Sequence, residues 1–318
     1  MRKWSLCFCV LVLEALVLPW AAQAQTLVKE SLASFPPPTI RLEYSRLAKL
    51  RTLPNYARLR QRYVGPRLRE LEESFSQLGV KESQIDEVVL GWQPGSTKME
   101  LEGLVAGSFT AQAIADRAAA RGMSPTTIAD MPAYCLGTES ASICLVVLKD
   151  SLGAFGTENS LATMLEAREG QTPSLASEER FVKLVGEAKP EAPIWGVAIG
   201  EAVPDWFRAW MPAQGNLQLD WGKAFQSVEA LVYSVEAADA VRLEIKMDCT
   251  TSQSAASTRQ VFEGLKMFQQ LAWQNLNPNL PNPFETVEIG QDDRRVSLKM
   301  TTSYADLEVP GAPGGPGN

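Results

Sequence analysis

The sequence predicts an α+β fold of two ββαββ-type repeats, with antiparallel sheets and helices packed on one face, preceded by N-terminal helices. Three observations lead to this prediction. Segments with strand-like alternation are paired around short turns, helical segments with apolar residues every three or four positions follow them, and this order occurs twice. A helix on one face of an antiparallel sheet is a common way to bury an apolar surface.

The first repeat is expected within residues 80–170. Its helices are predicted at 110–121, a segment rich in alanine that stops before Gly122, and at 160–168. Its strands are predicted at residues 86–93, 98–108, 134–136 and 142–149, with a short one near Ala154.

The second repeat is expected within residues 227–304. A long helix is predicted at 253–273, and the strands at residues 228–235, 241–248, 284–289 and 295–301. The two repeats align without gaps at an offset of 142, which places Glu102 on Glu244 and Leu101 on Leu243. The identity is low, so chance similarity of two α+β stretches is the alternative.

The rest of the chain divides by composition. Leucines at three- and four-residue spacing predict helices over residues 40–79. Prolines and tryptophans mark a connecting segment at 171–226, in which a helix is predicted at 177–187 and a buried strand at 194–199. Residues 25–39 end in Phe35-Pro36-Pro37-Pro38 and are expected to be an extended lead-in. Residues 305–318 are mostly glycine and proline, which predicts a disordered tail.

The N-terminus has the pattern of a secretory signal peptide. Arg2 and Lys3 precede an apolar run over residues 4–20, and Ala22-Gln23-Ala24 has the small residues that signal peptidase requires. Residues 1–24 are therefore expected to be removed, and the mature protein to reach the periplasm or the extracellular space. An uncleaved anchor helix is the alternative, although the run is short for a bilayer span.

Composition excludes several classes of function. Removing 24 residues from the 318-residue chain leaves 294, and losing Arg2, Lys3 and Glu14 changes the net charge from −7 to −8. An acidic exported protein is not expected to bind nucleic acid. The chain has no histidine, which excludes histidine metal ligands, histidine bases and histidine-based triads. No metal and no cofactor is expected.

Cysteines point to one disulfide. Cys135 and Cys144 flank the turn at residues 138–141 symmetrically, so they are expected to face each other across a hairpin at disulfide distance. Cys249 is expected to remain free and mostly buried. Two free thiols that act as small core residues are the alternative for Cys135 and Cys144.

The order of elements resembles a loose group of exported bacterial proteins known only as a domain-of-unknown-function family. The resemblance covers roughly residues 40–300. It depends on three segments, which are Gly79-Val80 followed by residues 85–89, residues 103–109 before a helix, and residues 152–157 before another helix. It implies a repeated α+β architecture and a location in the cell envelope, and it implies no catalytic residues.

No motif for catalysis is found. The sequence lacks a phosphate-binding glycine loop, a Gly-x-Ser-x-Gly elbow and a Ser-x-x-Lys pair. A glycosidase needs only two carboxylates, and Asp205 and Asp220, each beside a tryptophan that could stack on a sugar, are the candidates. The alternative is that Asp205 starts a helix and Asp220 lies in a loop.

Aromatic residues mark the candidate binding site. Trp206, Phe207, Trp210 and Met211 recur at helical spacing on one side of a segment that follows Pro204. They are expected to contact an apolar ligand, a peptide or an envelope protein, and one of the two tryptophans is expected to stay accessible. Burial between the two half-domains is the alternative.

A basic N-terminal region is the second feature. Residues 41–72 carry nine basic and three acidic side chains, among them Arg58, Arg60, Arg62, Arg67 and Arg69. They are expected to form a solvated helix face, to contact anionic lipid headgroups, or to contact the acidic remainder of the protein.

The sequence thus favours a non-enzymatic binding or structural role in the cell envelope. Two other functions stay open. One is a carboxylate-dependent hydrolase of envelope polysaccharide, and the other is a membrane-surface-associated protein that uses the arginine-rich helices.

Overall fold

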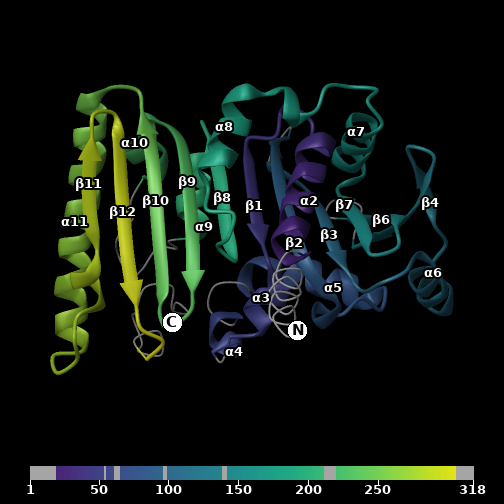
Figure 1. Cartoon of the computed structure of the whole chain (residues 1–318), viewed down its shortest axis with the longest axis horizontal. Helices are drawn as coiled ribbons and strands as arrows, with labels where there is room; N and C mark the ends of the chain where they lie inside the picture. The colour runs from purple at the N-terminus through teal and green to yellow at the C-terminus, as the bar shows by residue number, and fades with distance from the viewer. Residues whose placement is uncertain are drawn as a thin grey trace, which may run out of the picture.

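The computed structural model describes residues 19–53, 55–60, 65–95, 99–137, 142–210 and 220–305. Within them the chain forms a single 12-stranded sheet in the order β11-β12-β10-β9-β8-β1-β2-β3-β7-β6-β5-β4 (Figure 1). Every pair of neighbouring strands is antiparallel.

The strands are short to medium in length. They are β1 (Arg41–Ser45), β2 (Ile85–Pro94), β3 (Met99–Gly107), β4 (Thr126–Ile128), β5 (Met131–Leu136), β6 (Ile143–Lys149), β7 (Leu152–Gly156), β8 (Ile194–Ile199), β9 (Val228–Ala237), β10 (Val241–Cys249), β11 (Glu288–Asp292) and β12 (Arg295–Thr302).

Helices are distributed along the whole chain. They are α2 (Pro19–Ser34), α3 (Leu47–Arg51), α4 (Tyr56–Leu59), α5 (Gly65–Gln77), α6 (Ala111–Ala120), α7 (Glu158–Arg168), α8 (Glu179–Glu187), α9 (Ala202–Trp210), α10 (Trp221–Phe225) and α11 (Ser252–Leu276).

The prediction of two ββαββ repeats is wrong. The second stretch does follow the order β9-β10-α11-β11-β12, but in the first stretch four strands, β4 to β7, follow α6. Both stretches also belong to one sheet, with β1 and β8 between them, so they are not separate units. The prediction failed because strands joined by a short turn look alike in sequence wherever they occur. The order of strands in a sheet is decided by pairing between segments that are distant in sequence.

Strand β1 lies in a region that the sequence predicts to be helical. It pairs with β2 on one side and β8 on the other, with Tyr44 opposite Val89 and Trp195. The leucines at 42, 47 and 50 fit a helical period, but the helix α3 begins only at Leu47. Hydrogen bonds to strands on both sides determine the conformation of this segment, and those strands are far away in sequence.

Helix α2 also differs from the expectation. It continues to Ser34, where the sequence predicts an extended lead-in, and it spans the expected cleavage position after Ala24. The first residues of the predicted signal peptide, 1–18, and residues 306–318 of the predicted tail lie outside the described residues.

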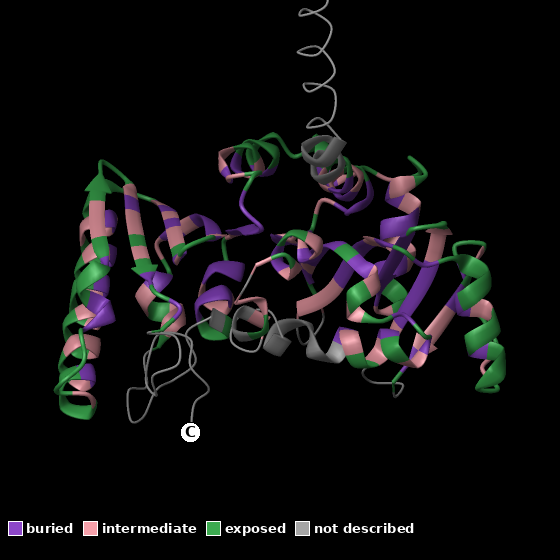
Figure 2. Ribbon diagram, turned by 60° about the horizontal axis from the view of Figure 1, so that its bottom comes forward, coloured by how far each residue is buried: buried purple, intermediate pink, exposed green. Residues whose placement is uncertain are grey.

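Helices pack on both faces of the sheet, which corrects the expectation of helices on one face. On the face toward the viewer in Figure 1, here called the front face, α2, α7 and α8 cover a core that includes Leu42, Val89 and Trp195. On the rear face, α3, α5, α6, α9, α10 and α11 cover a core that includes Phe155, Trp206 and Tyr233. Figure 2 shows the buried residues concentrated between these layers and the sheet.

The front face of β10, β12 and β11 carries polar side chains. On β10, Val241, Ile245 and Met247 point to the rear core, and the residues between them are charged or half-exposed. No helix of the described chain covers this front surface in Figure 1. We call it the open face.

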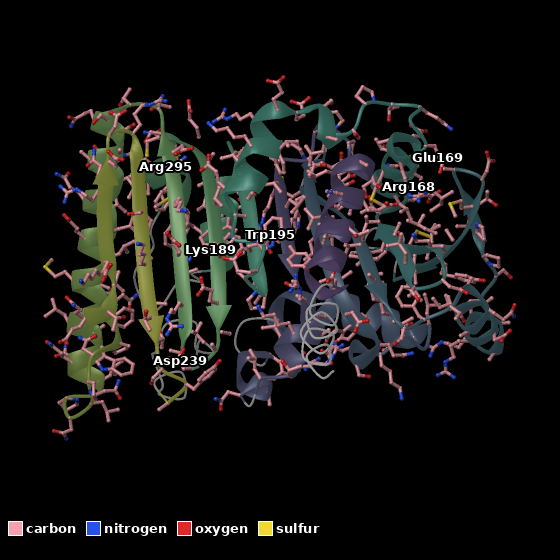
Figure 3. The ribbon with its side chains drawn as sticks, in the orientation of Figure 1. Arg168, Glu169, Lys189, Trp195, Asp239 and Arg295 are labelled. Carbon is pink, nitrogen blue, oxygen red and sulfur yellow. A yellow bond between two sulfur atoms is a disulfide. The ribbon has the colours of Figure 1, made fainter. Side chains whose placement is uncertain are left out.

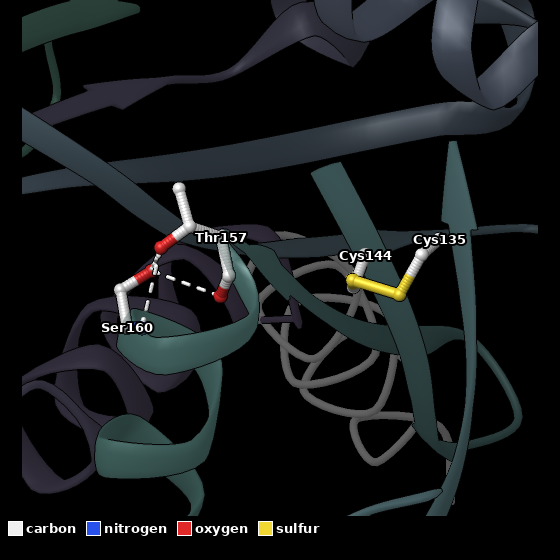
Figure 4. The surroundings of a disulfide bond; sticks show 4 residues. All are labelled: Cys135, Cys144, Thr157 and Ser160. Carbon is white, nitrogen blue, oxygen red and sulfur yellow. Dashed lines mark hydrogen bonds between the residues drawn. A yellow bond between two sulfur atoms is a disulfide. The ribbon is translucent and has the colours of Figure 1, made fainter. Parts of the chain in front are cut away.

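The predicted disulfide is confirmed. Cys135 on β5 lies opposite Cys144 on β6, and their sulfur atoms are bonded (Figure 4). Cys249 is free and buried, as predicted. Beside the bond in Figure 4, Thr157 and Ser160 share a hydrogen bond of 2.8 Å at the start of α7.

Candidate functional site

Two adjoining cavities lie where α8 meets the edge of the open face. The first has a volume of about 350 Å³ and is lined by α8, the β9 start, the β10 end and the β11–β12 turn. The second, of about 370 Å³, is lined by the end of β8, the start of β9 and the residue before β1. Arg180 and Glu229 line both cavities. We call the two cavities together the groove.

Helix α8 presents one side to the first cavity. Arg180, Lys183, Leu184 and Glu187 lie at three- and four-residue spacing, so they share this side. Phe181 and Leu184 are buried against the sheet, and this burial fixes the helix in place. The polar side chains of α8 are thereby directed along the groove.

Arg295 connects α8 to the sheet. Its guanidinium donates hydrogen bonds of 2.7 and 3.0 Å to the two carboxylate oxygens of Asp248, and it forms an ion pair of 3.0 Å with Glu187. The hydrogen bond to Asp248, more than any other contact, raises the pKa of Arg295, which remains a cation. Two-point contact between a guanidinium and a carboxylate fixes both groups in a plane. Figure 3 labels Arg295 on β12, toward the front side of the sheet.

Other charges in the first cavity have no ion-pair partner within the described part of the chain. They are the cations Lys183 and Arg294 and the anions Asp292 and Asp293. Asp292 is the last residue of β11, and Asp293, with a φ of 47°, and Arg294 form the tight turn that leads to β12. Groups of both signs are thus available to a ligand.

The second cavity is more apolar. Ile40, Ile199 and Val228 contribute its apolar wall, and Gln226 and Glu201 lie at its polar border. Arg180 and Glu229 form an ion pair of 3.2 Å between the two cavities. Both side chains are well exposed, at 59% and 42%, so this pair is a weak contact that a ligand can displace.

Cys249 lines the first cavity but is nearly inaccessible. Only 1% of the residue is exposed, and its thiol lies 3.8 Å from the Thr258 hydroxyl. Burial raises the pKa of the Cys249 thiol, which disfavours the nucleophilic thiolate. The thiol therefore has the properties of a small core residue.

The aromatic residues predicted to bind a ligand do not line the groove. Trp206 and Phe207 are buried in the rear core, with ring centroids 4.9 Å from Tyr233 and 4.1 Å from Phe225 respectively. This is the burial that the alternative interpretation predicts for them. The Trp210 side chain and Met211 lie outside the described residues. A ligand role for this segment remains a prediction.

The two candidate catalytic carboxylates are engaged in local structure. Asp205 forms an ion pair with Arg208 one turn along α9. The Asp220 carboxylate accepts a hydrogen bond of 3.1 Å from the Lys223 amide and caps α10. Asp205 lies in the first turn of α9, as the alternative interpretation expects, and Asp220 is the N-cap of α10, where that interpretation expects only a loop.

Several basic residues of the N-terminal region form ion pairs with acidic residues of the same chain. Arg60 pairs with Glu72, and Arg51 pairs with Glu82 and Asp86. Arg62 and the side chains of Arg58, Arg67 and Arg69 lie outside the described part. The pairs of Arg51 match the expectation of contact with the acidic remainder of the protein, whereas Glu72 belongs to the N-terminal region itself.

One apolar surface is exposed. Along the second half of α11, Met267, Phe268, Leu271 and Leu276 are exposed by 61%, 44%, 55% and 69%. Their opposite neighbours Phe262 and Trp273 are buried. Figure 2 shows this helix at the end of the molecule, with its exposed side away from the sheet.

A buried carboxyl group lies under α2, away from the lining of the groove. Glu102 on β3 is fully buried, and its Oε1 accepts a hydrogen bond of 2.6 Å from the Thr39 hydroxyl. Its Oε2 has no hydrogen-bond partner among the described residues. Burial, which outweighs the bond from Thr39, raises the pKa of Glu102 to about 8.

Sequence reasoning missed the groove. A signal was present, because Arg180, Lys183 and Glu187 share one side of the predicted helix over residues 177–187, and Asp292 to Arg295 form a charged turn. What it did not contain was the strand order that brings these two segments together, in which β9 pairs with both β8 and β10.

No cluster of three or more acidic, cysteine or histidine side chains suited to a metal ion is found in the described ranges. In the same residues, no helix has the length and apolar character needed to cross a bilayer.

Comparison with known proteins identifies a similar fold and no family. No protein-family profile matches the chain. No curated protein matches it significantly either. The structure is similar to crystal form III of a protein named TP0453, with a TM-score of 0.50 and 11% identity over 89% of this chain and 96% of that chain. Crystal form I gives a TM-score of 0.48 at 12% identity over 86% and 92% of the two chains. The likeness concerns the fold alone.

Proposed function

We propose that this protein is an exported, non-enzymatic binding protein of the cell envelope that holds a small ligand in the groove beside α8. The observation that carries the proposal is the pair of adjoining cavities, whose charged groups include Lys183, Arg294, Asp292 and Asp293 without ion-pair partners in the described chain. Concave sites with a few convergent polar groups are the usual place for ligands.

Two features support the location. The N-terminus has the pattern of a signal peptide, and the Cys135–Cys144 disulfide is of a kind that persists in oxidising compartments. The resemblance to exported proteins of unknown function agrees with the same proposal, and the location would be the periplasm or the extracellular space.

Binding is favoured over catalysis by the state of the charged groups. Asp248 and Glu187 are both neutralised by Arg295, and Glu229 is paired with Arg180. A carboxylate whose oxygens contact a guanidinium has fewer oxygens free to exchange a proton with a substrate.

The test is native mass spectrometry of protein exported from an expression host, together with thermal unfolding in the presence of phosphate, phosphoethanolamine, glutamate or lysine. We expect a small-molecule adduct, or a raised Tm with at least one solute, in the wild type. Both effects should weaken in the double variant Lys183→Ala, Arg294→Ala.

A matched control removes two exposed basic residues far along the sheet order, Arg121 on the end of α6 and Lys149 on β6. The variant Arg121→Ala, Lys149→Ala should behave as the wild type. A wild type with no adduct and no shift in Tm with any of the four solutes would contradict the proposal, as would equal effects in both double variants.

A second candidate role is peripheral contact with a membrane surface, favoured by the exposed apolar side chains of α11. Residues 264–276 contain one basic residue, Lys266, and no acidic one, so the stretch is not repelled by anionic headgroups. We expect flotation with vesicles that contain anionic phospholipid, and its loss in Phe268→Ser, Leu271→Ser. The charge-neutral control Gln253→Ser, Gln260→Ser changes exposed positions in the first half of the helix. Failure of the wild type to float rules this role out.

A further inference from the structure

We propose that the ligand of the groove is an amphipathic zwitterion, with a head that carries both an anionic and a cationic group and a short apolar tail. The proposal rests on the proposed function and adds the chemical class of the ligand. The head would occupy the first cavity and the tail the second.

The first cavity matches a head of mixed charge. Arg295 already forms ion pairs with Asp248 and Glu187, so these three groups bind each other and not a ligand. The groups that remain, Lys183 and Arg294 on one side and Asp292 and Asp293 on the other, are two cations and two anions. A purely anionic ligand would meet the two aspartates and a purely cationic one the two cations, so a ligand with both charges is complementary.

The second cavity matches a short tail. Ile40, Ile199 and Val228 form an apolar wall, and Val228 is almost fully buried at its base. Its volume of about 370 Å³ is close to the 350 Å³ of the first cavity. Together the two volumes fall in the range of small-molecule sites, roughly 300–1,000 Å³. An apolar chain placed there is removed from water, which favours binding in proportion to the apolar area that is buried.

The ion pair between Arg180 and Glu229 marks the boundary. These two side chains line both cavities, so a ligand that fills both must pass beside them. Because both side chains are exposed, displacing this ion pair costs little. A ligand with only a head or only a tail would use one cavity and leave the other to water.

The experiment measures binding by isothermal titration calorimetry with three probes. They are lysophosphatidylethanolamine with a twelve-carbon chain, used below its critical micelle concentration, phosphoethanolamine as the head alone, and lysophosphatidic acid with the same chain as the amphiphile without a cation. We expect the first probe to bind with a Kd at least tenfold lower than either of the others.

Two variants separate the ends of the groove. Lys183→Ala, Arg294→Ala should weaken the zwitterionic amphiphile and phosphoethanolamine alike, by tenfold or more. Gln226→Trp, which places a ring at an exposed border of the second cavity, should weaken the amphiphile tenfold and leave phosphoethanolamine unchanged. Circular dichroism and Tm establish that each variant is folded, and Arg121→Ala, Lys149→Ala is the control for lost positive charge.

The outcomes divide clearly. Equal affinity for phosphoethanolamine and the amphiphile, or no effect of Gln226→Trp, overturns the tail assignment and leaves a charged-ligand groove. Equal or tighter binding of lysophosphatidic acid overturns the zwitterionic head. Absence of binding by the zwitterionic amphiphile overturns the inference, whereas the proposed function fails only if the simpler solutes and the native adduct are also absent.

Discussion

Strands β8 and β10 lie two places apart in the same sheet, yet their sequences follow different rules. In β8 five consecutive residues, from Ile194 to Ala198, are buried. In β10 the rear-facing residues are mainly buried, while the front-facing Arg242, Glu244, Lys246 and Asp248 are half-buried or exposed. The difference depends on whether a helix packs on the front of the strand. Helix α8 packs on the front of β8, and no described helix covers the front of β10. A strand buried on both faces reads as a continuous apolar run, and a strand buried on one face alternates.

One row of directly paired residues crosses the whole front face, and its side chains change from apolar to polar along the sheet. From β4 to β11 its members are Thr126, Ala133, Val146, Ala154, Leu104, Val89, Tyr44, Trp195, Ser234, Glu244, Lys299 and Glu288. The row is apolar or aromatic from Ala133 to Trp195 and becomes polar at Ser234. The change occurs at the margin of α8, where the groove also lies, so the boundary between covered and uncovered sheet is where ligand access is available.

The largest contrast is expected at Trp195. The residue is 2% exposed and its ring lies 5.4 Å from that of Tyr44 on the covered part of the front face. Trp195→Ala should lower the free energy of unfolding by about 3–5 kcal/mol. Lys246→Ala on the open face should change it by less than about 0.5 kcal/mol. Urea denaturation of both variants checks this, and similar losses would show that the open face is as well packed as the covered one. Figure 3 labels Trp195.

The next contrast concerns two glutamates that the offset of 142 aligns. Burial raises the pKa of Glu102 to about 8, whereas for Glu244 burial is outweighed by Lys189, which lies 2.9 Å away, and the pKa is lowered. Between pH 4.5 and about 8 the folded protein therefore keeps a proton on Glu102 that the unfolded chain releases. Stability from this group is full below the unfolded pKa of 4.5 and is lost as pH rises through about 8.

Urea denaturation at pH 5, 7 and 9 measures this effect. The wild type should lose a few kcal/mol more than Glu102→Gln over this range, and Glu244→Gln should keep the loss of the wild type. Glu100 is the charged neighbour of Glu102 on β3, and it is present in all three proteins. Parallel pH profiles for the wild type and Glu102→Gln would contradict the assignment.

Removal of the disulfide is expected to have the third-largest effect on the free energy of unfolding. It closes a loop with a sequence separation of 9, for which the loss of chain entropy in the unfolded state corresponds to about 2–3 kcal/mol. Cys135→Ala, Cys144→Ala should lower the free energy of unfolding by that amount and leave the groove intact. Thiol titration of the unfolded, unreduced chain from Gln25 onward should find one reactive thiol, Cys249. Three reactive thiols would refute the bond.

The smallest effect is expected at Lys189, which follows α8 and reaches the open face. Its ammonium group lies 2.8 Å from Glu236 and 2.9 Å from Glu244. The hydrogen bonds that this ammonium group donates to the two carboxylates raise its pKa. The groups are exposed enough to be screened by solvent, so Lys189→Ala should cost less than about 1 kcal/mol, and less in 1 M salt. A loss above 2 kcal/mol would indicate that the open face is covered in the folded protein.

The sequence by itself determined most individual elements and one covalent bond. Strand β8 occupies the predicted residues 194–199, β2 and β10 lie within a residue of their predicted ends, and Cys135 faces Cys144. These features depend on alternation, turn residues and symmetric spacing, all of which are local. The segment Trp206–Phe207 was also recognised as an aromatic helix from its period, and its burial is one of the two interpretations that the period left open.

Only the tertiary structure decided how these elements combine. The two stretches joined into one sheet because β1 and β8, which belong to neither, pair with each other and with β2 and β9. The groove exists because α8 packs on β8 and β9 and meets the β11–β12 turn. This turn lies more than one hundred residues after α8 in the chain. Local propensity and period carry no information about such pairings, since the free energy that selects them comes from contacts between residues distant in sequence.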